Sequence, residues 1–223
     1  ISLAALSPTK AGNMAGKRAV QLLGAAPVNS GVMDLVLEPM IAAQIFGIIS
    51  ACFSGEAVRK NKSFLADKVG QLVAGTEVTL IDDGCMEQHL ASGSFDGEGT
   101  APQRTVLVEN GMLKQYLYDC LSAKKAGTVS TGNGVRGSYK GTPHVGTTNY
   151  YLAAGRYSPE QLIGSVEQGI YVTEILGAHT ANPVSGDFSF GASGFLIEHG
   201  VLCGRVRGVT IGGYFLQLLQ NIQ

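Results

Sequence analysis

The longest run of apolar residues in the chain occupies positions 40–53. Two apolar stripes at helical spacing run along it: Ile41, Ile45, Ile48 and Cys52 form one, and Ala42, Phe46, Ile49 and Phe53 form the other. This pattern predicts a helix that is apolar nearly all round, and such a helix is buried in a core or under a partner. The run is too short to cross a bilayer and contains Gln44, so we expect no membrane segment here.

Capping residues mark further helices. Ser7 and Pro8 have the identities of an N-cap and a first helical residue, and Gly24 stands where a helix would end. Ser158 and Gln161 have the spacing of a capping box, which predicts a helix over 159–168. Two shorter helices are predicted, one over 120–126 before Gly127 and a closing one whose apolar face carries Phe215, Leu218, Leu219 and Ile222.

The remaining pattern indicates strands joined by hairpins. Asn110-Gly111 lies between two alternating runs, which is the strongest hairpin signal in the chain. A second hairpin is predicted where residues 198–200 connect two apolar runs. Other strands are predicted within 31–39, 77–84, 147–152 and from Ile170 onward. Strands outnumber helices, so we predict an α+β fold with a predominantly antiparallel sheet and several packing helices.

The stretch 182–200 places Gly186, Gly191 and Gly194 inside a predicted strand region. Each glycine weakens a strand, so the backbone there must bend, bulge or lie close to another chain. One interpretation is that the glycines relieve curvature at a bulge. The other is that they let an extended polypeptide approach, because main-chain hydrogen bonds bind such a ligand without demanding a sequence. Physical reasoning alone favours the bulge slightly.

Charge and composition limit the possible partners. Among 223 residues, 16 Lys and Arg face 17 Asp and Glu, giving a net charge of −1. This balance argues against nucleic acid and acidic membranes as partners. Hydrophobic residues make up 45% and charged residues 15%, so part of the surface is expected to lie under another subunit. The four cysteines form no close pair, which indicates reduced thiols in the cytoplasm.

No self-sufficient catalytic constellation is evident in the sequence. The four histidines are widely separated and no cysteine pair completes a zinc site, so we predict no catalytic residue and no metal ligand in this chain. The glycine-rich "TGNGVRG" lacks the lysine of a phosphate loop. Acidic residues are expected in turns that they cap with their own side chains. These are Asp82, Asp83, Asp96, Glu98 and Asp187.

Several motifs together resemble one known family. In order along the chain they are "RKNKSFLADKVGQLV", "VTLIDDG", "FDGEGTAPQRTVLVENGMLKQYLYD", "STGNGVRGSY", "TTNYYLAAG" and "NPVSGDFSFGASGFLIEHG". The chain is similar to the TldD/PmbA family from about Leu6 onward, and within it to the PmbA (TldE) branch. The resemblance implies a cytoplasmic two-subunit peptidase associated with maturation of modified peptides such as microcins and with antitoxin degradation. Older names call such proteins modulators of DNA gyrase.

The resemblance also implies where zinc would bind. The TldD-like subunit of such a peptidase carries zinc on a helix with an H-E-x-x-x-H motif, whereas the PmbA-like subunit carries none. The corresponding helix of this chain is the run 40–53, which has Ala42, Ala43, Gln44, Phe46 and Gly47 at the positions concerned. Neutral side chains of these types cannot hold Zn²⁺ or activate water. We therefore expect no cofactor in this chain and zinc in a TldD-like partner.

The resemblance further implies a domain organisation and a shared peptide cleft. Residues 1–30 are interpreted as a helix-containing remnant of, or link to, an N-terminal α/β region, and 31–223 as a C-terminal antiparallel-sheet domain. The residues predicted to border a cleft for extended or unfolded peptide are Thr147, Asn149, Ser185, Gly186, Asp187, Phe188 and Gly194. The expected partner is a TldD-like subunit, or a second copy in a homodimer. A regulatory or assembly homodimer and, less favoured, an independent hydrolase are the alternative functions.

Overall fold

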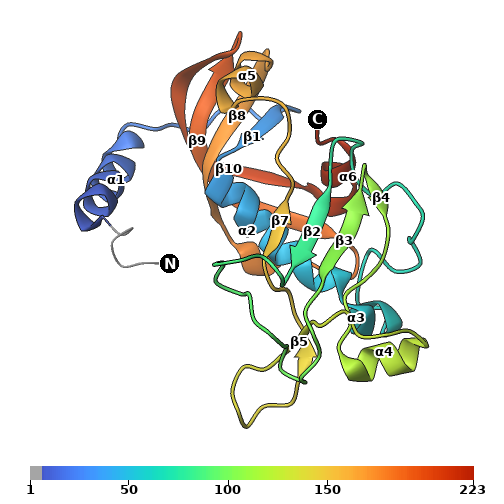
Figure 1. The fold of residues 1–223 in the computed structure, drawn as a ribbon. Helices are drawn as coiled ribbons and strands as arrows, with labels where there is room; N and C mark the ends of the chain where they lie inside the picture. The colour runs from blue at the N-terminus through green and yellow to red at the C-terminus, as the bar shows by residue number, and fades with distance from the viewer. Residues whose placement is uncertain (1–6) are drawn as a thin grey trace. The chain divides into compact units, whose positions relative to one another are not determined.

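A computed structural model describes residues 7–223 of the chain, and Figure 1 shows the course of its elements. Its helices are α1 (Pro8–Gln21), α2 (Pro39–Ile49), α3 (Gly55–Arg59), α4 (Cys120–Ala126), α5 (Pro159–Gly164) and α6 (Phe215–Gln220), with 3₁₀ turns η2 (Ser50–Phe53) and η3 (Ala178–Thr180). The strands of the first half are β1 (Asp34–Leu37), β2 (Leu80–Asp83), β3 (Arg104–Glu109) and β4 (Met112–Leu113). Those of the second half are β5 (Gly134–Val135), β6 (His144–Val145), β7 (Tyr150–Leu152), β8 (Gln168–Leu176), β9 (Asp187–Glu198) and β10 (Val201–Tyr214). The predicted α+β class is confirmed. No described helix is both long and apolar enough to cross a membrane.

The described chain forms two compact units that interleave in sequence. Unit 1 consists of residues 7–46, Arg156–Thr180 and Ser189–Gly212, and unit 2 consists of Gly47–Gly155, Ala181–Phe188 and Gly213–Gln223. The chain therefore returns to each unit more than once, and neither unit is a single sequence segment. The boundary predicted near residue 30 concerns a different division, between this domain and an N-terminal region, and it stays a prediction.

Unit 1 is built on a four-stranded sheet in the order β1-β8-β9-β10. Strand β1 pairs with β8 in parallel, which is the exception to the predicted antiparallel arrangement, whereas β8 and β9 are antiparallel. Strands β9 and β10 flank the turn at His199 and Gly200, so the predicted second hairpin is confirmed. Side chains of β8 and β9 supply the buried core of this unit, including Val172, Phe190 and Ile197.

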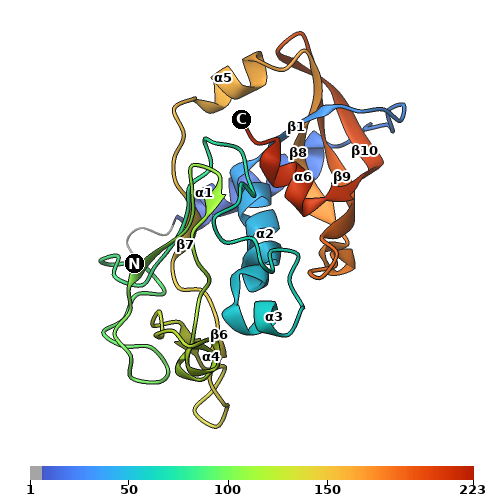
Figure 2. The same cartoon turned by 90° about the vertical axis from the view of Figure 1, so that its right-hand side faces the viewer.

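Unit 2 contains a second four-stranded sheet in the order β4-β3-β2-β7, with a separate β5–β6 pair. Asn110 and Gly111 join β3 to β4 with φ of 49° and 78°, the left-handed conformations that a two-residue hairpin turn requires. Figures 1 and 2 show α4 and the β5–β6 pair at the same end of this unit. The fully buried Phe53, Leu107 and Leu113 belong to its core.

Helix starts agree well with the capping residues, and helix ends agree less well. Ser7 accepts a hydrogen bond from the Lys10 amide, and Ser158 and Gln161 form the predicted capping box. Helix α5 nevertheless stops at Gly164 and not near Gln168, and β8 begins at Gln168. Gly164 has a low helix propensity, and Val166, two residues later, is β-branched. The residues after Gly164 therefore favour the end of the helix and the start of an extended segment.

Gly194 lies where the backbones of β8 and β9 approach closely. A Cβ atom at this position would be 1.9 Å from the carbonyl oxygen of Tyr171, while a Cβ at Gly191 would lie 3.5 Å from its nearest neighbour. The register between the strands shifts between Val172 and Glu174, next to the pair Val172–Gly194. The close approach expected from the sequence is therefore made, at Gly194, by the chain's own strand at a bulge.

We expect Gly194→Ala to destabilise the chain by about 3 kcal/mol, because the new methyl group must displace backbone that is hydrogen-bonded in a sheet. Gly191→Ala, three residues away on the same strand, is the matched control and should change the free energy of unfolding by less than about 1 kcal/mol. Urea unfolding followed by circular dichroism measures both. Equal stabilities of the two variants would contradict the close contact at Gly194.

Candidate functional site

Helix α2 and the turn η2 cover the run in which the family resemblance places a zinc motif. Ala42, Ala43, Gln44, Phe46 and Gly47 offer no imidazole, thiolate or carboxylate. The potential ligands that flank these positions are Glu38, which is paired with Arg18, and Cys52, which is 1% exposed and whose pKa burial raises to about 11. Across residues 7–223 no group of three or more His, Cys, Asp or Glu side chains is arranged to hold a metal ion. The donor set of this helix does not fit zinc.

The segment 182–188 forms a tight turn in unit 2 that leads into β9. The Gly186 amide donates to the Asn182 carbonyl at 2.8 Å, and the Asn182 amide donates to the Asp187 carbonyl at 2.9 Å. Gly186 has a φ of +81°, and a Cβ there would lie 3.2 Å from the Phe64 ring. The backbone conformation therefore favours glycine at this position, and a side chain there would also press on the Phe64 ring.

Phe188 anchors this turn to the interior of unit 2. Its ring stacks on Phe215 with 4.7 Å between centroids, and Phe215 in turn stacks on Phe64 at 6.0 Å. The Phe215 amide also donates to the Gly186 carbonyl at 2.7 Å. Phe188 is 8% exposed, so its side chain serves packing more than contact with a ligand.

The side chains that reach solvent in this turn are those of Ser185 and Asp187. Both residues are exposed, and the Ser185 hydroxyl donates to the Asp187 carboxylate. Of the seven predicted cleft residues, six belong to unit 2, whereas the buried Gly194 belongs to unit 1. Ser185, Gly186, Asp187 and Phe188 are brought together by the turn.

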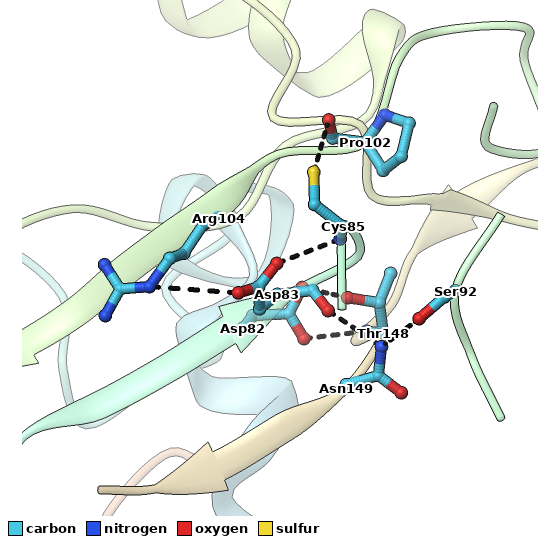
Figure 3. A network of polar contacts seen from close by, with 8 residues as sticks. All are labelled: Asp82, Asp83, Cys85, Ser92, Pro102, Arg104, Thr148 and Asn149. Carbon is cyan, nitrogen blue, oxygen red and sulfur yellow. Dashed lines mark hydrogen bonds and ion pairs between the residues drawn. The ribbon is translucent and has the colours of Figure 1, made fainter. Parts of the chain in front are cut away.

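Thr147 and Asn149 are half-buried beside a polar network on the strands β2 and β7, part of which Figure 3 shows. Asn149 donates through its side-chain amide to the Asp83 carbonyl and to the Ser92 hydroxyl, each at 2.8 Å. Its side-chain carbonyl accepts from the Ala91 amide at 3.2 Å. Asn149 therefore fixes the loop after β2 to the strand β7.

Asp82 is the centre of this network, although the sequence did not identify it as a site residue. Its carboxylate accepts from the Thr148 amide at 2.7 Å, the Thr148 hydroxyl at 2.9 Å and the Asn133 side-chain amide at 2.7 Å. Asp82 is 1% exposed, and burial raises its pKa above the ordinary range of an aspartate. The three donated hydrogen bonds oppose that rise by stabilising the charged form.

The network corrects one sequence-based expectation. Asp82 lies within strand β2 and caps no turn, since its buried carboxylate accepts from Asn133 and Thr148. Asp83 ends the strand and caps the turn that follows, as expected. The neighbouring Asp83 accepts from the Cys85 amide at 2.9 Å and lies 3.8 Å from the Arg104 guanidinium (Figure 3). Thr148 and Asn133 were also missed, because nothing in a single sequence indicates that two residues so far apart share one carboxylate.

The expectation for Asp96 is confirmed. Its carboxylate accepts from the amides of Glu98 and Thr100, each at 2.9 Å, as in a side-chain-capped turn. The other carboxylate oxygen accepts from the Gly134 amide at 2.8 Å. Glu98 accepts from the Cys120 amide at 2.7 Å, so both acidic groups are engaged with backbone and tie the turn to α4 and β5.

We expect Asp82→Ala to destabilise the chain by about 2–3 kcal/mol, because the donors of Asn133 and Thr148 are left unsatisfied in the interior. Glu109→Ala is the control, since Glu109 is an exposed carboxylate on the neighbouring strand and should cost less than about 1 kcal/mol. Denaturant unfolding measures both variants. A loss from Asp82→Ala no larger than that from Glu109→Ala would show that the network does not hold the unit together.

Comparison with known proteins identifies the family to which these motifs belong. Residues 30–223 match the family model described as the PmbA/TldA metallopeptidase C-terminal domain. The chain is 33% identical over 208 residues to the metalloprotease TldD homolog of Haemophilus influenzae, covering 92% of this chain and 43% of that protein.

Two solved structures are similar over nearly the whole chain. One, from Thermotoga maritima and described as a modulator of a DNA gyrase, has a TM-score of 0.91 and 32% identity, covering 99% of this chain and 50% of that one. The other, TldE from Thermococcus kodakarensis, has a TM-score of 0.82 and 35% identity, covering 92% and 47%. The chain thus spans about half the length of these relatives. By sequence and by fold, it belongs to the TldD/PmbA family of metallopeptidase-like proteins.

Proposed function

We propose that this chain is part of the metal-free, TldE-like subunit of a cytoplasmic two-component metallopeptidase that matures or degrades peptides. In this role it contributes interface and part of the peptide cleft, and a TldD-like partner contributes zinc. The observation that carries the proposal is the composition of α2, whose Ala42, Ala43, Gln44, Phe46 and Gly47 lack every usual zinc ligand. The similarity to a TldE structure supports the same assignment.

Surface composition supports a partner. Helix α1 has no buried residue within the described chain, and its Met14 and Val20 are 46% and 56% exposed. Helices of this length are marginally stable alone in water, so a covering surface would stabilise α1. Arg18 of α1 is paired with Glu38 of this chain, so the charges that α1 offers to a covering surface are those of Lys10 and Lys17, which favours an acidic or neutral surface.

The proposed cleft draws on the six predicted residues that belong to unit 2. Ser185 and Asp187 supply exposed polar groups, while Thr147 and Asn149 are half-buried. Gly186 and Phe188 are buried and would act by shaping the backbone that carries Ser185 and Asp187. Gly194 is buried in unit 1, and its place at a cleft stays a prediction. A peptide bound there would be recognised through its main chain more than through its sequence.

The subunit assignment is tested by metal analysis. We expect the purified chain alone to bind no stoichiometric zinc and to cleave no peptide, and a mixture with a TldD-like partner to contain zinc and show chelator-sensitive cleavage. Size-exclusion chromatography with light scattering separates a heterodimer from a homodimer. Stoichiometric zinc with chelator-sensitive cleavage in the isolated chain would overturn the assignment. A stable homodimer that does not bind the TldD-like partner would favour the alternative role as an assembly protein.

The cleft assignment is tested at Asp187, an exposed residue whose removal should spare the core. In the assembled complex, Asp187→Ala is expected to lower kcat/KM for an unstructured peptide by about tenfold, the loss of one charge-assisted hydrogen bond. Glu167→Ala, at a carboxylate 78% exposed in unit 1, is the control and should leave kcat/KM unchanged. If both variants cleave like the unaltered complex, Asp187 does not border the cleft.

A further inference from the structure

A cavity of about 300 Å³ in unit 2 has a chemical character that the proposed peptidase role does not use. It lies beside the β3–β4 hairpin, and the chain following α4 forms another part of its wall. Its volume is at the lower end of the range for small-molecule sites. Val69, Tyr118 and Val129 give it apolar surface, and Lys114 gives it a cation.

The lining of this cavity is free of negative charge. None of its ten lining residues is Asp or Glu, and Lys114 is the one charged residue among them. The wall at Thr128–Thr131 belongs to a stretch from Cys120 to Pro159 that contains no acidic residue. Lys124 and Lys125 precede this wall in the chain and are exposed. The lining itself therefore carries a positive charge, although the whole chain has a net charge of −1.

The walls are held in place by hydrogen bonds that leave other donors uncommitted. Gln103 donates to the Ser130 carbonyl at 3.0 Å, and Gln115 donates to the Val106 carbonyl at 3.3 Å. The Tyr118 amide donates to the Thr131 hydroxyl at 2.8 Å. By contrast, the phenol of Tyr118 makes no hydrogen bond within residues 7–223, so it is available to a ligand.

The ammonium of Lys114 is likewise only partly engaged. Its Nζ lies 3.1 Å from a carboxylate oxygen of Glu109, and both side chains are more than two-fifths exposed. Exposed pairs of this kind contribute little net energy, so Lys114 can exchange or share its partner at small cost. Two further acidic residues lie near the lining residues. Asp119 is buried and accepts from the Ser122 amide at 2.7 Å, and the charge of Asp67 adds to the burial that raises the pKa of Tyr116.

We propose that this cavity binds a small monocarboxylate with an apolar body, anchored by Lys114 and assisted by Tyr118. One cation suits a singly charged ligand better than a phosphate, and the valines at the wall suit an aliphatic or aromatic body. The carboxylate can come from a free organic acid or from the C-terminal residue of a peptide. Binding in this cavity would require neither a metal nor a partner subunit.

The test titrates the chain with hexanoate, observed by NMR chemical shifts and isothermal titration calorimetry. We expect saturable binding that Lys114→Met weakens by about tenfold and Tyr118→Phe weakens by less. Glu109→Gln should strengthen binding because it removes the competing carboxylate. Lys125→Met is the matched control, a lysine outside the lining, and hexylamine is the control for charge. Circular dichroism verifies that each variant is folded.

A second arm distinguishes the two sources of carboxylate. The peptide Gly-Gly-Gly-Leu is titrated with a free and with an amidated C-terminus. Lys114-dependent binding of the free form alone, with little binding of hexanoate, assigns the site to peptide C-termini, whereas the reverse assigns it to small acids. If neither probe binds, or if Lys114→Met and Lys125→Met lower affinity equally, the proposal is wrong, and the peptidase role is unaffected.

Discussion

The buried carboxylate of Asp82 is the constraint on which much of unit 2 depends. A charge taken out of water must be surrounded by donors, and Asp82 finds them on two segments distant in sequence, at Asn133 and at Thr148. These hydrogen bonds thereby bring together the three motifs that contain Asp82, Asn133 and Thr148. The Asn133 amide, which also donates to the Gly146 carbonyl at 3.0 Å, extends the network along the chain that enters β7.

This network gives the family motifs a physical meaning. The residues of "VTLIDDG", "STGNGVRG" and "TTNYY" are held together by hydrogen bonds whose partners are buried or half-buried, so one function of these motifs is to fix loop positions. If Thr147 and Asn149 border a peptide cleft, the hydrogen-bond network of Asp82 would hold the backbone of that part of the cleft in place. Rigidity is what a site that binds main chain requires, because affinity then depends on backbone positions more than on side-chain identity.

Local signals in the sequence predicted local structure. The Asn110-Gly111 turn, the Ser7 and Ser158 caps and the αL residue Gly127 after α4 all follow from interactions within a few residues, and the structure has them. The Asp82 network could not be predicted in this way, because its partners are 51 and 66 residues away. For Gly194 the sequence indicated a close backbone neighbour without identifying it, since the neighbouring strand β8 and a bound peptide would both require a residue without a side chain there.

The absence of metal ligands in α2 is the physical reason for the proposal that this chain helps to form a peptide cleft. A helix without imidazole or carboxylate groups in its apolar run cannot itself activate water, so in the proposed two-subunit peptidase this chain would contribute through surfaces that position a substrate or a partner. Buried residues such as Ile45 and Ile49 retain the packing role of the helix whether or not a neighbouring position holds a metal. The fold of the family would in this way be retained in the proposed subunit that has no metal of its own.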